Sequence, residues 1–138
     1  MPGSSSKKSI LIIDDAIDVL YILATSLRLE GYEVFSAKSG TEALEVLSKN
    51  LKLNLIILDM QIGDMSGIDF IEHLEQNFPD IINSVPIVFH SGAQNIPKSK
   101  AVGIIQKPMN MKDFFTSVNH FIEIGYHPPF FKLQENHE

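Results

Sequence analysis

Ile10-Leu-Ile-Ile-Asp-Asp15 is the stretch of this 138-residue chain that decides its fold. Its four apolar residues occupy odd and even positions alike, which is typical of a strand that a sheet buries on both faces. A second run, from Leu53 to Leu58, has the same character apart from Asn54, and it also ends at a carboxylate, Asp59. Both runs predict central strands of a parallel sheet, each followed by an acidic residue.

Helical patterns alternate with strand-like runs along the rest of the chain. A helix is predicted from Ala16 up to a stop at Gly31, because its apolar residues are spaced as on one helix face. Those residues are Ile17, Leu20, Tyr21, Ala24 and Leu27. The further predicted elements are a strand at 33–37, a helix opened by the capping box Ser39-Gly-Thr-Glu42, a helix that uses Ile68, Ile71 and Leu74 and ends before Pro79, strands at 86–90 and 103–106, and a last helix that Asn110-Met-Lys-Asp113 caps and that continues to about Ile124.

This alternation predicts right-handed βαβ units, and therefore an α/β fold in which a doubly wound, five-stranded parallel sheet has helices on both faces. The length favours one compact domain. We place that domain at residues 9–125, between a flexible Ser/Gly/Pro-rich lead at 1–8 and a tail at 126–138.

Composition excludes several classes of function. The chain carries 11 Lys and Arg against 17 Asp and Glu, a net charge of −6, and has no basic run beyond Lys7-Lys8. Nucleic acid and anionic membranes are therefore not expected as partners, because both require clustered cations. The absence of cysteine excludes disulfides, thiolate metal sites and thiol nucleophiles. No apolar run has the length of a membrane span, and we expect a cytoplasmic protein.

Polar residues stand where the predicted strands end, which is where such sheets place their chemistry. They are Asp14, Asp15, Asp59, Ser91 and Lys107. Clustered carboxylates stay ionised only with compensation, which a hard cation such as Mg²⁺ supplies. Lysine and hydroxyl groups suit phosphoryl oxygens. Together these groups indicate phosphoryl transfer to an aspartate.

The chain resembles the receiver domain of two-component response regulators from about Lys8 to Ile124. The resemblance rests on several motifs that occur in the family's order. They are Ile10-Leu-Ile-Ile-Asp-Asp15, Asn54-Leu-Ile-Ile-Leu-Asp59, Asp59-Met-Gln-Ile-Gly-Asp-Met-Ser-Gly67, Val88-Phe-His-Ser-Gly-Ala93 and Gln106-Lys-Pro108. It implies a flavodoxin-like sheet of strand order 2-1-3-4-5.

The same resemblance implies the roles of the site residues. Asp59 would be the phosphoacceptor, and Asp14 and Asp15 would hold Mg²⁺ together with the Gln61 backbone carbonyl. Ser91 and Lys107 would bind the phosphoryl oxygens, and the peptide bond from Lys107 to Pro108 would be cis. The chain would be a signalling domain rather than an enzyme, catalysing only its own phosphorylation and dephosphorylation. A histidine kinase or phosphotransfer protein would supply the phosphoryl group.

The chain also departs from the family's pattern. Ile62-Gly63 replaces the usual Met-Pro, and Ile104 stands where the family has an aromatic switch residue. Only 15 residues separate Ser91 from Lys107, so that we expect a shortened fourth helix. These departures suggest an intact phosphorylation site with an unusual output surface.

Two functional readings remain open. The first is a stand-alone receiver that signals through contacts with an unidentified downstream protein, because too few residues follow the last helix for an effector domain, unless the chain is a fragment of a larger protein. The second is a phosphorylation-independent interaction module that has lost switching. A flavin-binding protein fits poorly, since carboxylates stand where a phosphate would need amides. The apolar tail from Tyr126 to Phe131 is either frayed, packed over the short crossover or docked on a partner.

Overall fold

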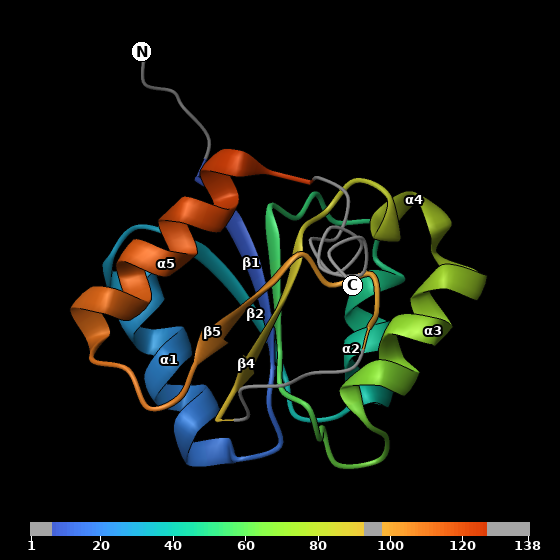
Figure 1. Ribbon diagram of the computed structural model, residues 1–138, viewed down its shortest axis with the longest axis horizontal. Coiled ribbons are helices and arrows are strands. Elements are labelled where there is room, and N and C mark those ends of the chain that lie inside the picture. The colour runs from blue at the N-terminus through green and yellow to red at the C-terminus, as the bar shows by residue number, and fades with distance from the viewer. Residues whose placement is uncertain (1–6, 93–97, 127–138) are drawn as a thin grey trace, which may run out of the picture.

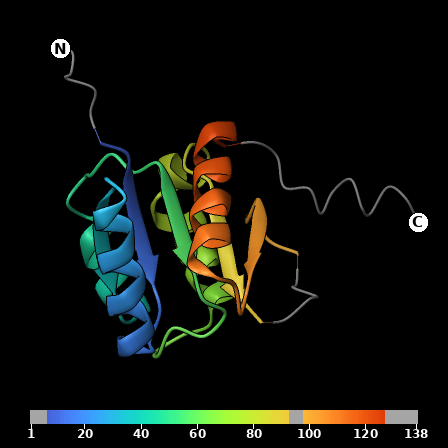
Figure 2. The same cartoon turned by 90° about the vertical axis from the view of Figure 1, so that its left-hand side faces the viewer.

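The computed structural model describes residues 7–92 and 98–126. A parallel sheet of strand order β2-β1-β3-β4-β5 lies between two layers of helices, with α1 and α5 on one face and α2, α3 and α4 on the other (Figures 1 and 2). The strands are β1 (Ser9–Ile13), β2 (Glu33–Ala37), β3 (Leu55–Leu58), β4 (Ile87–Ser91) and β5 (Gly103–Gln106). The helices are α1 (Ile17–Leu29), α2 (Gly40–Leu47), α3 (Gly67–Asn77), α4 (Pro79–Ile82) and α5 (Met111–Ile124). The predicted fold class and strand order are confirmed.

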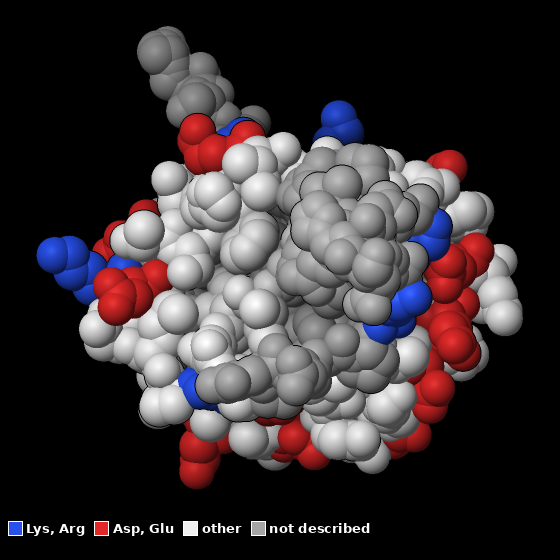
Figure 3. All heavy atoms as spheres, viewed as in Figure 1, with Lys and Arg blue, Asp and Glu red and all other residues white. Residues whose placement is uncertain are grey.

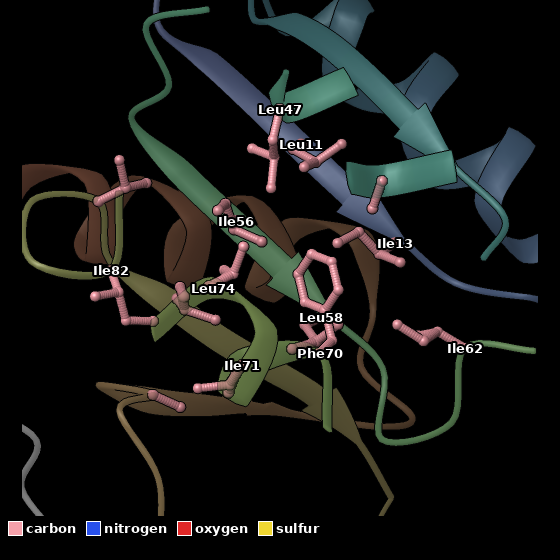
Figure 4. Close-up of a cluster of buried hydrophobic side chains, with 14 of the residues drawn as sticks. Leu11, Ile13, Leu47, Ile56, Leu58, Ile62, Phe70, Ile71, Leu74 and Ile82 are labelled. Atoms are coloured by element: carbon pink, nitrogen blue, oxygen red, sulfur yellow. The ribbon is translucent and has the colours of Figure 1, made fainter. Parts of the chain in front are cut away.

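The central strands β1 and β3 are buried at every position, as their apolar runs predict. Alternate residues supply two separate cores. Leu11, Ile13, Ile56 and Leu58 pack with α2 and α3, where Phe70 and Leu74 meet them (Figure 4). Ile10, Ile12, Leu55 and Ile57 pack against α1 and α5. A strand whose interior residues supply both cores has no interior position for a charged side chain, which is why the carboxylates follow the strands.

The buried face of α1 differs from the predicted one. Leu20, Leu23, Ala24 and Leu27 face the sheet, whereas Ile17 and Tyr21 are 61% and 70% exposed. Six of the first seven residues of α1 are apolar, so that several stripes fit the spacing and only packing against the sheet selects one.

Three other boundaries also differ from the prediction. Strand β3 begins at Leu55 rather than Leu53, and β4 is shifted by one residue. The short helix α4 was not predicted: Pro79 ends α3, but it also occupies the first position of α4, where a missing N–H costs nothing.

The shortened fourth helix was expected in the connection from β4 to β5. Residue 92 and residues 98–102 form no helix, and the intervening residues 93–97 lie outside the described part of the chain. The helix labelled α4 precedes β4 and is not this crossover. The tail from residue 127 onward also lies outside the description, so that its role and the domain boundaries stay predictions. Within residues 7–92 and 98–126, none of the helices has the length and apolar character needed to cross a bilayer.

Two leucines of α1 allow a matched test of this packing. Leu27 is fully buried and Leu29 is 83% exposed. We expect Leu27→Ala to lower the free energy of unfolding by about 2–5 kcal/mol, because it removes buried contacts and leaves a cavity. Leu29→Ala removes the same atoms from the same helix and should change it by less than about 0.5 kcal/mol. Urea denaturation measures both, and equal losses would contradict the orientation of α1.

Candidate functional site

The backbone of the sheet fixes Asp14 immediately after β1. Its N–H donates to the carbonyl of Ala37 at the end of β2, at 3.1 Å. One carboxylate oxygen, Oδ1, accepts from the N–H of Ala16 at 2.9 Å. The side chain is only 2% exposed. Asp14 therefore presents its second oxygen, Oδ2, in a fixed direction.

Asp59 is held in the same way after β3. Its N–H donates to the carbonyl of Ile13 at 3.1 Å, which brings it beside Asp14. Its Oδ1 accepts from the N–H of Met60 at 2.7 Å. The remaining oxygen, Oδ2, accepts from the Lys107 ammonium at 3.4 Å.

Lys107 bridges the two carboxylates from the other side of the site. Its Nζ lies 3.4 Å from Asp59 Oδ2 and 3.5 Å from Asp14 Oδ2. Its backbone N–H donates to the carbonyl of Ser91 at 2.8 Å, so that the ends of β4 and β5 are joined. The peptide bond from Lys107 to Pro108 is cis, as the resemblance implied. The structure thus brings together residues from the ends of four strands.

The donor set fits a divalent cation. Asp14, Asp15 and Asp59 each offer a carboxylate oxygen, and these oxygens lie within 4.8 Å of one another. Asp14 is buried, Asp59 is half-buried and Asp15 is exposed, so the cluster opens toward solvent on one side. Hard cations such as Mg²⁺ prefer carboxylate oxygens and keep several waters. The cluster meets both requirements.

The ionisation of Asp59 reflects this crowding. Its pKa is raised, first by burial and then by the negative charge of Asp14, while the Lys107 ammonium acts in the opposite direction. The folded chain therefore holds the charged form of Asp59 at a cost, which a bound cation would relieve.

Gln61 lies in the loop between β3 and α3, which we call the β3–α3 loop (residues 59–66). The loop folds back on itself through an antiparallel bridge between Gln61 and Ser66, and the N–H of Ile62 donates to the carbonyl of Met65. At its end, a Cβ on Gly67 would lie 2.5 Å from the Asp59 carbonyl oxygen, so that only glycine fits there. The role of the Gln61 carbonyl as a metal ligand stays a prediction.

Ser91 and His90 end β4 and face opposite sides of the sheet. Ser91 is buried at the edge that carries the carboxylates. The buried His90 ring packs against Phe114 of α5, with ring centroids 5.4 Å apart. Burial, helped by the positive charge of Lys107, lowers the pKa of His90 to about 4, although Asp14 opposes the shift.

Asp64, in the β3–α3 loop, makes contacts that the sequence analysis did not identify. Its carboxylate accepts hydrogen bonds from Gly40 and Thr41 at the start of α2. Because more than twenty residues separate these partners, no local spacing signals the contact. Asp69, by contrast, lies in the first turn of α3, and its N–H donates to the hydroxyl of the N-cap Ser66.

Comparison with known proteins gives the family. The response regulator receiver domain family matches residues 10–119, most of the chain. The chain therefore belongs to the response regulator receiver domains of two-component systems. Among solved structures, it is similar to a response regulator receiver domain protein (CheY-like) from Methanospirillum hungatei JF-1, at 27% identity and a TM-score of 0.73, covering 86% of this chain and 95% of that one.

Curated relatives are of very different lengths. The chain is 28% identical over 126 residues to the sensor kinase CckA of Brucella abortus (strain 2308), covering 86% of this chain but 13% of the kinase. It is 26% identical over 120 residues to the sporulation initiation phosphotransferase F of Bacillus subtilis (strain 168), covering 85% of this chain and 95% of that protein. This chain thus corresponds in length to a small part of the sensor kinase and to almost all of the phosphotransferase.

The depressed pKa of His90 predicts a pH-dependent stability. Unfolded histidine titrates near 6.5 and folded His90 near 4, so that the unfolded chain binds more protons between these values. The contribution of neutral His90 to the free energy of unfolding is therefore complete above pH 6.5. About 3 kcal/mol of this free energy is lost as the pH falls to 4. In urea titrations, His90→Phe should lose less stability than the wild type across this range. His73→Phe, at an exposed position, is the control and should follow the wild type.

The pKa of Asp59 is raised in the folded chain, so that folding favours its protonated form over its charged form. We therefore predict that the charge of Asp59 at pH 7 destabilises the metal-free fold. We expect Asp59→Asn to raise Tm without metal by a few degrees, on the scale of about 1 kcal/mol. Added Mg²⁺ should then raise Tm more for the wild type than for the variant, because binding stabilises the folded state.

Glu75→Gln is the control for this experiment, because it removes an exposed carboxylate of α3 outside the acidic cluster. It should leave the response to Mg²⁺ unchanged in thermal melts. A Tm that falls in Asp59→Asn, or a response to Mg²⁺ that both variants share with the wild type, would contradict the prediction.

Proposed function

We propose that this chain accepts a phosphoryl group on Asp59, in an Mg²⁺-dependent reaction, from a histidine kinase or a histidine phosphotransfer protein, and signals through protein contacts. The observation that carries the proposal is the contact between Asp59 Oδ2 and Lys107 beside the buried Asp14 carboxylate. Membership of the receiver family supports it.

The side chains suggest a division of roles. Because Met60 holds Asp59 Oδ1, Oδ2 is the oxygen available to attack phosphorus. The P–O bond to Asp59 then forms as the P–N bond of a phosphohistidine donor breaks. The Lys107 ammonium, already beside Oδ2, would contact the phosphoryl oxygens and offset their negative charge. Ser91, joined to Lys107 through the backbone, would donate its hydroxyl to another of these oxygens.

The metal would be held by the acidic cluster. Asp14, Asp15 and Asp59 would supply carboxylate oxygens, and the Gln61 carbonyl a further one. A bound Mg²⁺ supplies positive charge that offsets the charge of the phosphoryl oxygens.

The expected partners are proteins. Lysine and arginine side chains are scattered over the face seen in Figure 3 and form no continuous basic patch on its visible part. The net charge of −6 also favours protein partners over nucleic acid or anionic lipid. The cytoplasmic location stays a prediction.

A second candidate is the phosphorylation-independent interaction module. Ile104 in β5 favours it, because this half-buried aliphatic residue stands where the family's aromatic switch residue is expected. The ordered contacts of Asp14, Asp59 and Lys107 favour phosphorylation instead.

Intact-mass measurement after incubation with Mg²⁺ and acetyl phosphate separates the two candidates. We expect one phosphoryl group on the wild type, none when the metal is chelated and none on Asp59→Asn, because that amide cannot form the acyl phosphate. Glu75→Gln should be phosphorylated like the wild type. A wild type that takes no phosphoryl group from acetyl phosphate or from a panel of histidine kinases would favour the interaction module.

A further inference from the structure

The carboxylate of Asp64 joins the β3–α3 loop to the start of α2. Oδ1 accepts from the N–H of Gly40 at 2.8 Å, and Oδ2 accepts from the N–H of Thr41 at 3.1 Å. The Thr41 hydroxyl also donates to Oδ2, at 2.5 Å. The first N–H groups of a helix have no partner within the helix, and a carboxylate is favoured there. Asp64 therefore caps α2 from a different segment of the chain.

This cap is additional to the helix's own. Ser39 is the N-cap of α2, and its hydroxyl accepts from the N–H of Glu42. Ser39 and Asp64 thus satisfy different N–H groups of the same helix end. Only the bonds of Asp64 also restrain the β3–α3 loop.

Packing independently seats the same loop on the same helix end. A Cβ on Gly40 would lie 2.5–2.7 Å from three side-chain atoms of Met65, so that Met65 occupies the space beside the glycine. Gly63 has a φ of +88°, and a Cβ added there would lie 3.4 Å from the Lys38 carbonyl oxygen and 3.7 Å from Asp15 Cβ. The loop is therefore pressed against both of the loops that follow β1 and β2.

Hydrogen bonding favours the charged form of Asp64. Its pKa is lowered, mainly by the hydrogen bond from the Thr41 hydroxyl; desolvation, the next-largest effect, opposes this, and the N–H groups of Gly40 and Thr41 lower the pKa further. At neutral pH these are charge-assisted bonds.

Resting on the proposed function, we propose that Asp64 is a positioning residue of the phosphorylation site. Its bonds to α2 fix the β3–α3 loop, and with it the Gln61 backbone, relative to the carboxylates that follow β1. The loop carries Asp59 at its start and Gln61 three residues before Asp64, so that a loosened tip would misplace the metal-binding groups. Residues that orient metal ligands typically change metal affinity 10–100-fold when they are substituted.

Asp64→Ala and Ser39→Ala form a matched pair. Both remove capping of α2 and both should lower Tm, but only Asp64→Ala releases the β3–α3 loop. In calorimetric titrations with Mg²⁺, we expect Asp64→Ala to weaken binding by about tenfold and Ser39→Ala to leave it near the wild-type value. Amide hydrogen exchange should quicken at Gly40 and Thr41 in Asp64→Ala.

Thr41→Val keeps the proposal testable if Asp64→Ala does not fold. It removes the hydroxyl bond and leaves both N–H donors in place, so that we expect a smaller loss of Mg²⁺ affinity in the same direction. Equal Mg²⁺ affinity in all of the variants and the wild type would overturn the positioning role.

The two proposals fail in distinguishable ways. A wild type that binds Mg²⁺ but takes no phosphoryl group would overturn the proposed function, while the Mg²⁺ titrations would still decide the role of Asp64. A wild type that does not bind Mg²⁺ would overturn both.

Discussion

The parallel pairing of β1 with β2 and β3 is the constraint on which the site depends. Two ladder-like bonds, from Asp14 to Ala37 and from Asp59 to Ile13, hold two carboxylates side by side just beyond the ends of their strands. Like charges at this separation repel each other, so the arrangement is kept by the sheet and not by the side chains. Lys107, from the far edge strand, reduces the repulsion without removing it. The acidic cluster is thus costly without a cation, and a bound cation would offset that cost.

The strongest sequence signals were those in which one physical cause dominates. Burial on both faces leaves a continuous apolar run, so that the runs ending at Asp14 and Asp59 located the central strands and the acidic edge. The strand Glu33–Ala37 and the helix Met111–Ile124 were also found at their observed bounds. Roles within the site came from the family resemblance, because residue types at strand ends indicate a chemistry without assigning each atom.

The failures have physical reasons as well. The apolar excess in α1 hid the face that packing selects, and Tyr21 was placed in the core although it is exposed. Pro79 was interpreted only as a helix stop, although it also begins α4. Asp64 was missed because its partners lie on another βα unit, and contacts of that kind exist only once the sheet has assembled.

Strand β4 ends with two neighbouring residues that belong to different halves of the molecule. Ser91 lies at the acidic edge, and His90, one peptide unit earlier, touches Phe114 of α5 behind the sheet. Both residues belong to one strand end, so a movement of its backbone changes the side-chain contacts on both sides of the sheet. In the proposed reaction, a displacement of this strand end would also move the contact between His90 and Phe114. A partner bound to α5 would then sense the reaction without approaching the reacting atoms.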